Sequence, residues 1–110
     1  MSNIKKELNK LGMNNDLKGY YYCKYAIELI IRLGFFVEIN NIYVLTGDKF
    51  KTSGKNVERN IRYSIEKTWE KGNTENIDKM FGYSVDYERG KPTNREFLFM
   101  IADRVKNFYE

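Results

Sequence analysis

Residues 47–69 read GDKFKTSGKNVERNIRYSIEKTW and join a basic turn to a long amphipathic segment. Val57, Ile61 and Ile65 recur at intervals of four residues, which places all three on one side of a helix. This spacing predicts a helix over residues 54–71 with one apolar face and one polar face. The helix decides the fold class, because an apolar stripe of this length must pack against other helices or a sheet.

The residues before this helix fit the spacing of a helix-turn-helix. In that motif a small residue in the first helix is followed four positions later by the turn, and six positions further by an apolar anchor in the second helix. Gly47, Lys51 and Val57 stand at these positions. The pattern predicts a helix-turn-helix over about residues 42–71, with the second helix entering the DNA major groove.

The polar face of the second helix supplies candidate base-reading residues. Arg pairs with guanine through two hydrogen bonds, Glu accepts from cytosine, and Asn recognises adenine. Near the start of the helix these roles fall to Asn56, Glu58 and Arg59. The competing interpretation is a solvated helix face, in which Glu58 and Arg62 form an i,i+4 pair worth about 0.2–0.5 kcal/mol.

Charge supports an anionic partner around the same stretch. The whole chain carries a net charge of +4, and residues 47–72 hold seven basic against four acidic side chains. Phosphate groups are bound mainly by cationic side chains, which hold a protein on DNA without reading its sequence. The candidates for these contacts are Lys49, Lys51, Lys55 and Arg62.

The rest of the chain also predicts helices. The 110 residues suit one domain, residues 1–110, with one core. Residues 35–45 fit either a strand pair turning at Asn40-Asn41 or a short helix, and local propensity leaves both open. Thr93 and Glu96 form a T-x-x-E capping box that opens a last helix. We therefore expect an all-α fold, a compact bundle of about six helices containing the helix-turn-helix.

Composition argues against several other classes. The chain has no histidine and a single cysteine, Cys23, so a disulfide framework and a Cys/His zinc site are excluded. It shows no phosphate-binding loop, dinucleotide fingerprint or acid–base pair, and we expect no enzyme activity, cofactor or metal. The apolar runs are too short to cross a membrane, and we expect a cytoplasmic protein.

Four stretches carry a resemblance to a known family. They are LKGYYY at 17–22, VERNIRYSIEKTWEKGN at 57–73, MFGYSV at 80–85 and GKPTNREFLFMIADRV at 90–105. Together they resemble the C-terminal DNA-binding effector domain of stage-zero sporulation protein A, the response regulator of endospore formation in Bacillus and Clostridium. The PTN-x-EF and FGY pieces are more diagnostic of this family than the helix-turn-helix spacing.

The resemblance implies a specific function. A domain of this family is an all-α unit of about six helices that binds double-stranded DNA at a promoter box resembling TGTCGAA and regulates transcription. Carried over by position, Glu58 and Arg59 would read bases and Arg62 would contact the DNA. The family pairs on DNA, which implies a homodimer or a heterodimer with the full-length sporulation regulator.

Three of the chain's departures from the family pattern bear most on its function. Lys55-Asn56 replaces a Ser-Arg pair, which removes one base-reading cation. Thr46-Gly47 replaces Ile-Ala, and since Gly costs about 1 kcal/mol relative to Ala inside a helix, we expect a short or irregular supporting helix. The third departure is the receiver domain, for which the 110 residues have no room, so we expect no switching by phosphorylation of this chain itself.

These departures keep a second hypothesis open. The chain would be impaired in DNA binding and would instead pair with, or antagonise, the full-length sporulation regulator. Phe99 and Phe108 on the last helix would offer an exposed pairing surface, although core packing or a frayed terminus explains such aromatics as well.

Overall fold

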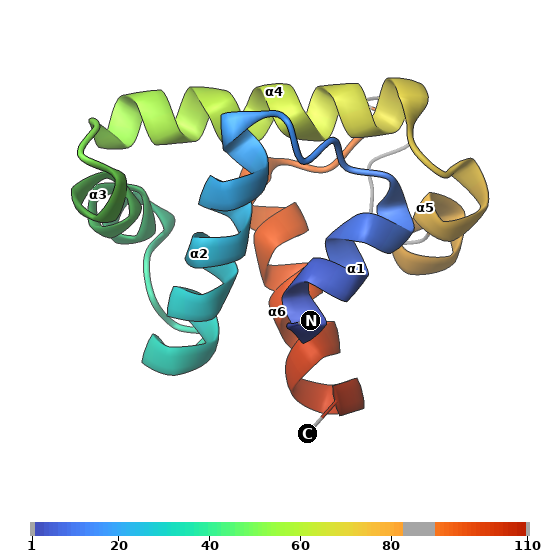
Figure 1. Ribbon diagram of the computed structural model, residues 1–110. Helices are drawn as coiled ribbons and strands as arrows, with labels where there is room; N and C mark the ends of the chain where they lie inside the picture. The colour runs from blue at the N-terminus through green and yellow to red at the C-terminus, as the bar shows by residue number, and fades with distance from the viewer. Residues whose placement is uncertain (1, 83–89, 110) are drawn as a thin grey trace.

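Six helices form the part of the chain described by the computed structural model, residues 2–82 and 90–109. In chain order they are α1 (Asn3–Leu11), α2 (Lys18–Leu33), α3 (Ile39–Phe50), α4 (Gly54–Lys71), α5 (Thr74–Phe81) and α6 (Asn94–Tyr109). Figure 1 shows α4 lying across one end of the bundle, while α2 and α6 run away from its inner side. This arrangement confirms the predicted all-α fold.

The structure decides the segment that the sequence left open. Residues 39–50 form α3, so the helical alternative for this segment is correct and the strand pair is wrong. Ile42 and Thr46 are fully buried on its inner side, whereas Leu45 is 40% exposed. Packing of this stripe against the bundle, rather than local strand propensity, determines the conformation. The helix-turn-helix accordingly begins at Ile39, three residues before the predicted start.

The expectation of a short or irregular supporting helix is wrong. α3 is a regular helix of 12 residues that includes Gly47. A Cβ atom at this position would lie 2.5 Å from the carbonyl oxygen of Thr52 in the turn that follows. Gly47 is therefore compatible with the helix because it allows the turn to fold back closely against α3, and this packing outweighs its low helix propensity.

Two capping arrangements fix the N-terminal ends of α4 and α6, the helices that matter most for the site. The Ser53 Oγ accepts a hydrogen bond of 3.0 Å from the Asn56 backbone N–H at the start of α4. The predicted capping box is present at the start of α6, where the Thr93 N–H donates to Glu96 Oε1 and the Glu96 N–H donates to Thr93 Oγ1. Both helices therefore begin at well-defined residues.

An aromatic cluster joins α4 to α5 and α6. The ring of Trp69 lies with its centroid 5.2 Å from that of Phe81 and 6.0 Å from that of Phe97. Phe81 and Phe97 stack on each other with centroids 5.6 Å apart. Contacts of this kind are worth about 0.5–1.5 kcal/mol beyond burial. They hold the inner face of α4 to the core, which leaves its opposite face uncovered.

The crossing of α2 and α4 is equally close. A Cβ atom on Gly19 would lie 2.1 Å from Ser64 Oγ and 2.2 Å from the Asn60 carbonyl oxygen. Only glycine fits here, because both partners belong to α4 and one of them is backbone. The first turn of α2 therefore abuts the middle of α4 directly. None of the helices within residues 2–82 and 90–109 is long and apolar enough to cross a membrane.

Candidate nucleic-acid interface

The turn between α3 and α4 has the geometry that the spacing predicts. Lys51 adopts a left-handed conformation, with φ 59° and ψ 48°, directly after α3. The backbone N–H groups of Lys51 and Thr52 both donate to the carbonyl oxygen of Gly47. Val57 is fully buried and anchors the second helix. Gly47, Lys51 and Val57 therefore occupy the three expected positions of the motif.

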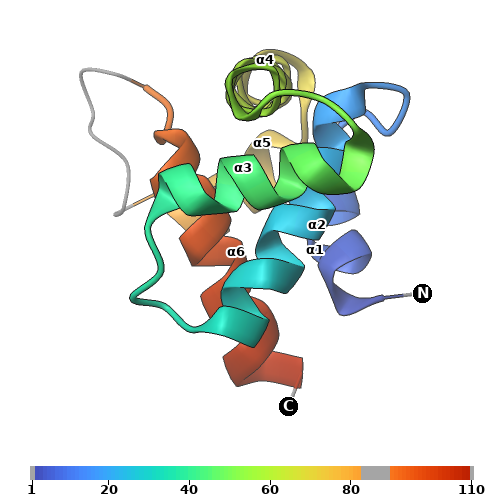
Figure 2. The same cartoon turned by 90° about the vertical axis from the view of Figure 1, so that its left-hand side faces the viewer.

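The uncovered face of α4 carries the cations. Lys55, Arg59 and Arg62 are exposed on it, and Figure 2, which views α4 end on, shows that no other helix covers this side. Within the described residues, Lys51, Lys55 and Arg59 have no acidic partner. Arg59 lies on the outer face, one helical turn from Lys55 and Asn56, and is exposed. Its guanidinium is therefore available to a ligand in front of the helix.

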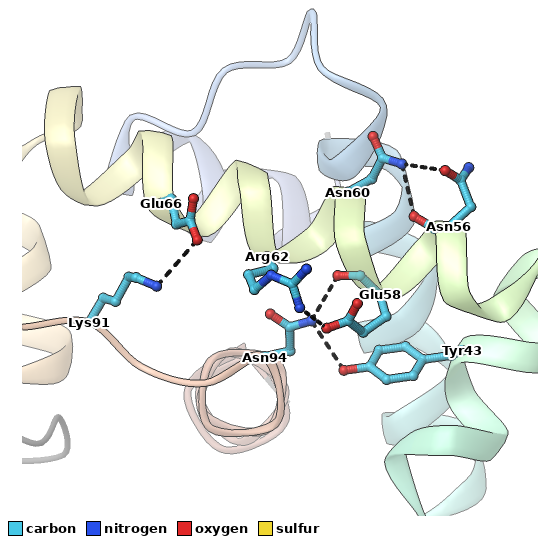
Figure 3. A network of polar contacts seen from close by, with 8 residues as sticks. All are labelled: Tyr43, Asn56, Glu58, Asn60, Arg62, Glu66, Lys91 and Asn94. Carbon is cyan, nitrogen blue, oxygen red and sulfur yellow. Dashed lines mark hydrogen bonds and ion pairs between the residues drawn. The ribbon is translucent and has the colours of Figure 1, made fainter. Parts of the chain in front are cut away.

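Asn56 is engaged within the protein. Its side-chain amide donates to Thr52 Oγ1 over 2.9 Å. Its Oδ1 accepts a bond of 3.1 Å from Asn60 Nδ2 (Figure 3). Asn60 also donates to the Asn56 backbone carbonyl, over 2.8 Å. An adenine would have to replace these bonds before Asn56 could read it. The local spacing of four residues explains why all three bonds form.

Glu58 lies on the flank of α4 rather than at the centre of its outer face. Its carboxylate forms an ion pair with Arg62, as the competing interpretation of a solvated helix face predicted (Figure 3). The side chain of Glu58 is 28% exposed. Both residues line a hollow of about 450 Å³ together with Tyr43 of α3 and Asn94 of α6. The structure thus separates Glu58 from Arg59, which face different directions from adjacent positions.

Lys49 lies apart from the other candidate phosphate-binding residues. Its Nζ lies 5.7 Å from the centroid of the Tyr25 ring on α2. This cation–π contact holds the side chain at the α2–α3 side of the motif, worth about 0.5–1 kcal/mol at an exposed site. Lys51 follows α3 and Lys55 stands in the first turn of α4, so both are exposed on either side of the turn, whereas Lys49 is held against α2.

Comparison with known families identifies the chain. The family described as Sporulation initiation factor Spo0A C terminal matches residues 4–105. The chain belongs to this family. The Spo0A C-terminal domain is the DNA-binding effector domain of a sporulation response regulator, a regulatory family rather than a family of enzymes. The match covers all six helices of the Spo0A-type domain, apart from the first residue of α1 and the last four of α6.

Sequence reasoning missed the contribution of α6, and of the segment just before it, to the candidate interface of this Spo0A-type domain. Lys91, three residues before α6, forms an ion pair with Glu66 of α4, with 3.4 Å between Nζ and Oε1. This pair offsets a negative charge that would repel phosphates. Arg95 stacks over Phe99, with Cζ 4.2 Å from the ring centroid, so Phe99 is half-buried rather than exposed. The diagnostic PTN sequence was the one signal that pointed to this region.

Tyr43 is the other residue that the sequence did not single out. Burial raises the pKa of its hydroxyl. The hydroxyl oxygen accepts a hydrogen bond of 3.1 Å from Asn94 Nδ2. Residues 43 and 94 are far apart in sequence, so no local pattern could have paired them. Among residues 2–82 and 90–109, no three His, Cys, Asp or Glu side chains gather as metal ligands do.

Proposed function

We propose that this Spo0A-type domain is a sequence-specific DNA-binding transcriptional regulator that inserts α4 into the major groove of a promoter box. The observation that carries the proposal is the uncovered outer face of α4, with Arg59 on it and no acidic partner for Arg59 within the described residues. An arginine in this setting is free to donate two hydrogen bonds to guanine. The box implied by the family resemblance is similar to TGTCGAA.

The other candidate residues then take different roles. Lys51 and Lys55 are exposed at the turn and the first turn of α4, where they suit phosphates on one strand. Arg62 is already paired with Glu58, so DNA would have to share or replace that pair. Glu58 and Asn56 contribute to base reading only where their internal bonds open. The domain would act in the cytoplasm, at the nucleoid.

Arg59→Ala tests the proposal. Loss of a bidentate contact to guanine costs about 1–3 kcal/mol of discrimination, so affinity for the box should fall about 5- to 150-fold. Affinity for a scrambled duplex should change much less, because only one cation is lost. Arg32→Ala is the matched control: Arg32 is also exposed and lies at the end of α2 that points away from α4. Fluorescence anisotropy measures the affinity of the wild-type chain, Arg59→Ala and Arg32→Ala for both duplexes.

Equal losses on the box and the scrambled duplex would contradict a base-reading role for Arg59 and leave it as a phosphate contact. Equal losses in Arg59→Ala and Arg32→Ala would contradict the placement of DNA on α4.

One observation favours a second candidate function. Two of the three candidate base readers, Asn56 and Glu58, are held by bonds within the domain. Readout would then be weak, and the domain would act by pairing with the full-length sporulation regulator. Of the aromatics considered for this surface, Phe108 is 71% exposed. Co-purification of the two proteins at micromolar concentration, together with no box preference for this chain, would favour this candidate over the first.

A further inference from the structure

Among the α6 side chains that the structure describes, Asn94 alone bonds to both helices of the motif. Its Nδ2 donates to the Tyr43 hydroxyl on α3 over 3.1 Å and to the Glu58 backbone carbonyl on α4 over 3.0 Å. Figure 3 shows the amide pointing between these two partners. A side-chain amide nitrogen carries two N–H groups, so both are used. Asn94 is 9% exposed, and both bonds are partly buried.

The orientation of this amide follows from its partners. The Glu58 carbonyl can only accept, so the nitrogen and not the oxygen of Asn94 must face it. A carboxylate of the same shape at position 94 would turn an acceptor toward that carbonyl. It would also add a negative charge next to the Glu58–Arg62 pair. The site therefore requires an amide and not merely a polar residue of this size.

α6 holds Asn94 in a fixed position. It is the first residue of the helix and stands between the capping-box residues Thr93 and Glu96. The next turns of α6 are anchored in the core by Phe97, Leu98 and Ile101, which are fully buried. α6 cannot move without disturbing the core. Through its two hydrogen bonds, Asn94 therefore fixes α3 and α4 relative to the core.

We infer that Asn94 is a positioning residue that holds α3 and α4 at the angle needed for sequence readout. This inference rests on the proposed DNA-binding function. Asn94 itself touches no base. It fixes the backbone at Glu58, and therefore the direction in which the adjacent Arg59 leaves the helix. The diagnostic PTN sequence thereby gains a role: it joins the last helix to the helix-turn-helix.

The first arm of the test needs no DNA. Hydrogen exchange of backbone amides is compared in the wild-type chain, Asn94→Ala, Tyr43→Phe and the control Asn107→Ala. Tyr43→Phe keeps the ring and removes only one bond partner, so it remains informative where Asn94→Ala folds poorly. Asn107 is exposed on the same helix, and its side-chain bond within the described part of the chain goes to Asp103, one turn away.

Loss of the Asn94 hydrogen bonds should speed amide exchange in α4 more than in α6. Protection of amides 57–62 should fall about fivefold in Asn94→Ala and about twofold in Tyr43→Phe, relative to amides 101–105 of α6. Asn107→Ala should leave this ratio unchanged. A uniform fall across α3, α4 and α6, or no change in the ratio, would overturn the inference by showing that Asn94 contributes only general stability or nothing.

The second arm measures anisotropy with the box and scrambled duplexes. The box-to-scrambled affinity ratio should fall about threefold or more in Asn94→Ala and Tyr43→Phe. Affinity for the scrambled duplex and its dependence on salt should not change, because no cation is removed. An unchanged ratio would overturn the positioning role even if exchange had quickened. A wild-type chain without box preference would refute the proposed function. The exchange measurement would then test by itself whether Asn94 holds α3 and α4 in place.

Discussion

Gly47→Ala tests the close fit between α3 and the turn. A Cβ at this position meets three backbone atoms: the Thr52 carbonyl oxygen at 2.5 Å, the Ser53 carbonyl carbon at 3.1 Å and the Gly54 nitrogen at 3.2 Å. Non-bonded heavy atoms are most favourable at about 3.5–4.0 Å, so the turn would have to retreat by roughly 1 Å. None of the three atoms belongs to a flexible side chain that can swing aside.

Two opposing effects set the magnitude. Alanine is favoured over glycine inside a helix by about 1 kcal/mol. Forcing an extra carbon into a packed site costs about 1–3 kcal/mol. The hydrogen bond of 2.9 Å from the Thr52 N–H to the Gly47 carbonyl would also be strained, which costs about 1 kcal/mol. The free energy of unfolding should therefore fall by about 1–3 kcal/mol.

Urea denaturation followed by circular dichroism measures this change. Asn41→Ala is the control, because Asn41 is exposed on α3 and its replacement improves helix propensity without a steric contact; it should raise stability by about 0.5 kcal/mol. The box affinity of Gly47→Ala should also fall, since the turn sets the start of α4. A Gly47→Ala protein as stable as Asn41→Ala would refute the reasoning about the turn.

Three further predictions follow from single residues. Lys51→Gly should raise the free energy of unfolding by about 0.5–1 kcal/mol, because Lys51 is left-handed, and should weaken binding to both duplexes equally; lower stability in urea would contradict this. Glu7→Ala should lower the free energy of unfolding by about 1.5–3 kcal/mol, because the fully buried Glu7 carboxylate pairs with Arg104 over 2.6 Å and with Lys10 over 3.1 Å; a loss below about 1 kcal/mol would show that these pairs contribute little. Burial raises the pKa of the Cys23 thiol, so the unfolded chain releases this proton first and the free energy of unfolding should fall as pH rises above about 8.5. Cys23→Ala should reduce that slope in denaturation curves at pH 8, 9 and 10, and an unchanged slope would assign it to other groups.

Local patterns predicted much of the fold. α4 has the predicted bounds, because its apolar spacing, Ser53 cap and terminal Gly72 all agree. The capping box at Thr93 and Glu96 was equally reliable, since both of its hydrogen bonds connect residues three apart. Residues 39–50 were harder. Their short apolar run fits a strand or a helix, and only packing against α2 and α4 distinguishes the two.

The site depended more on long-range contacts. Helical spacing placed Arg59 and Lys55 on the outer face, where the structure has them exposed. It did not single out the bonds of Asn56 to Thr52 and Asn60, although each of them spans only four residues. Nor could it place Asn94 against α4, since that contact spans 36 positions in the sequence. Such contacts depend on how α6 packs, which local patterns do not specify.

The proposed function is tested most directly by the binding of the wild-type chain to the TGTCGAA-like duplex and to its scrambled counterpart. Anisotropy titrations at two salt concentrations separate base reading from phosphate attraction, because only the latter weakens steeply with salt on both duplexes. We predict a box preference of about tenfold or more, equivalent to about 1.4 kcal/mol, that persists at the higher salt. Equal affinity for the two duplexes at both salt concentrations would contradict a sequence-specific regulator.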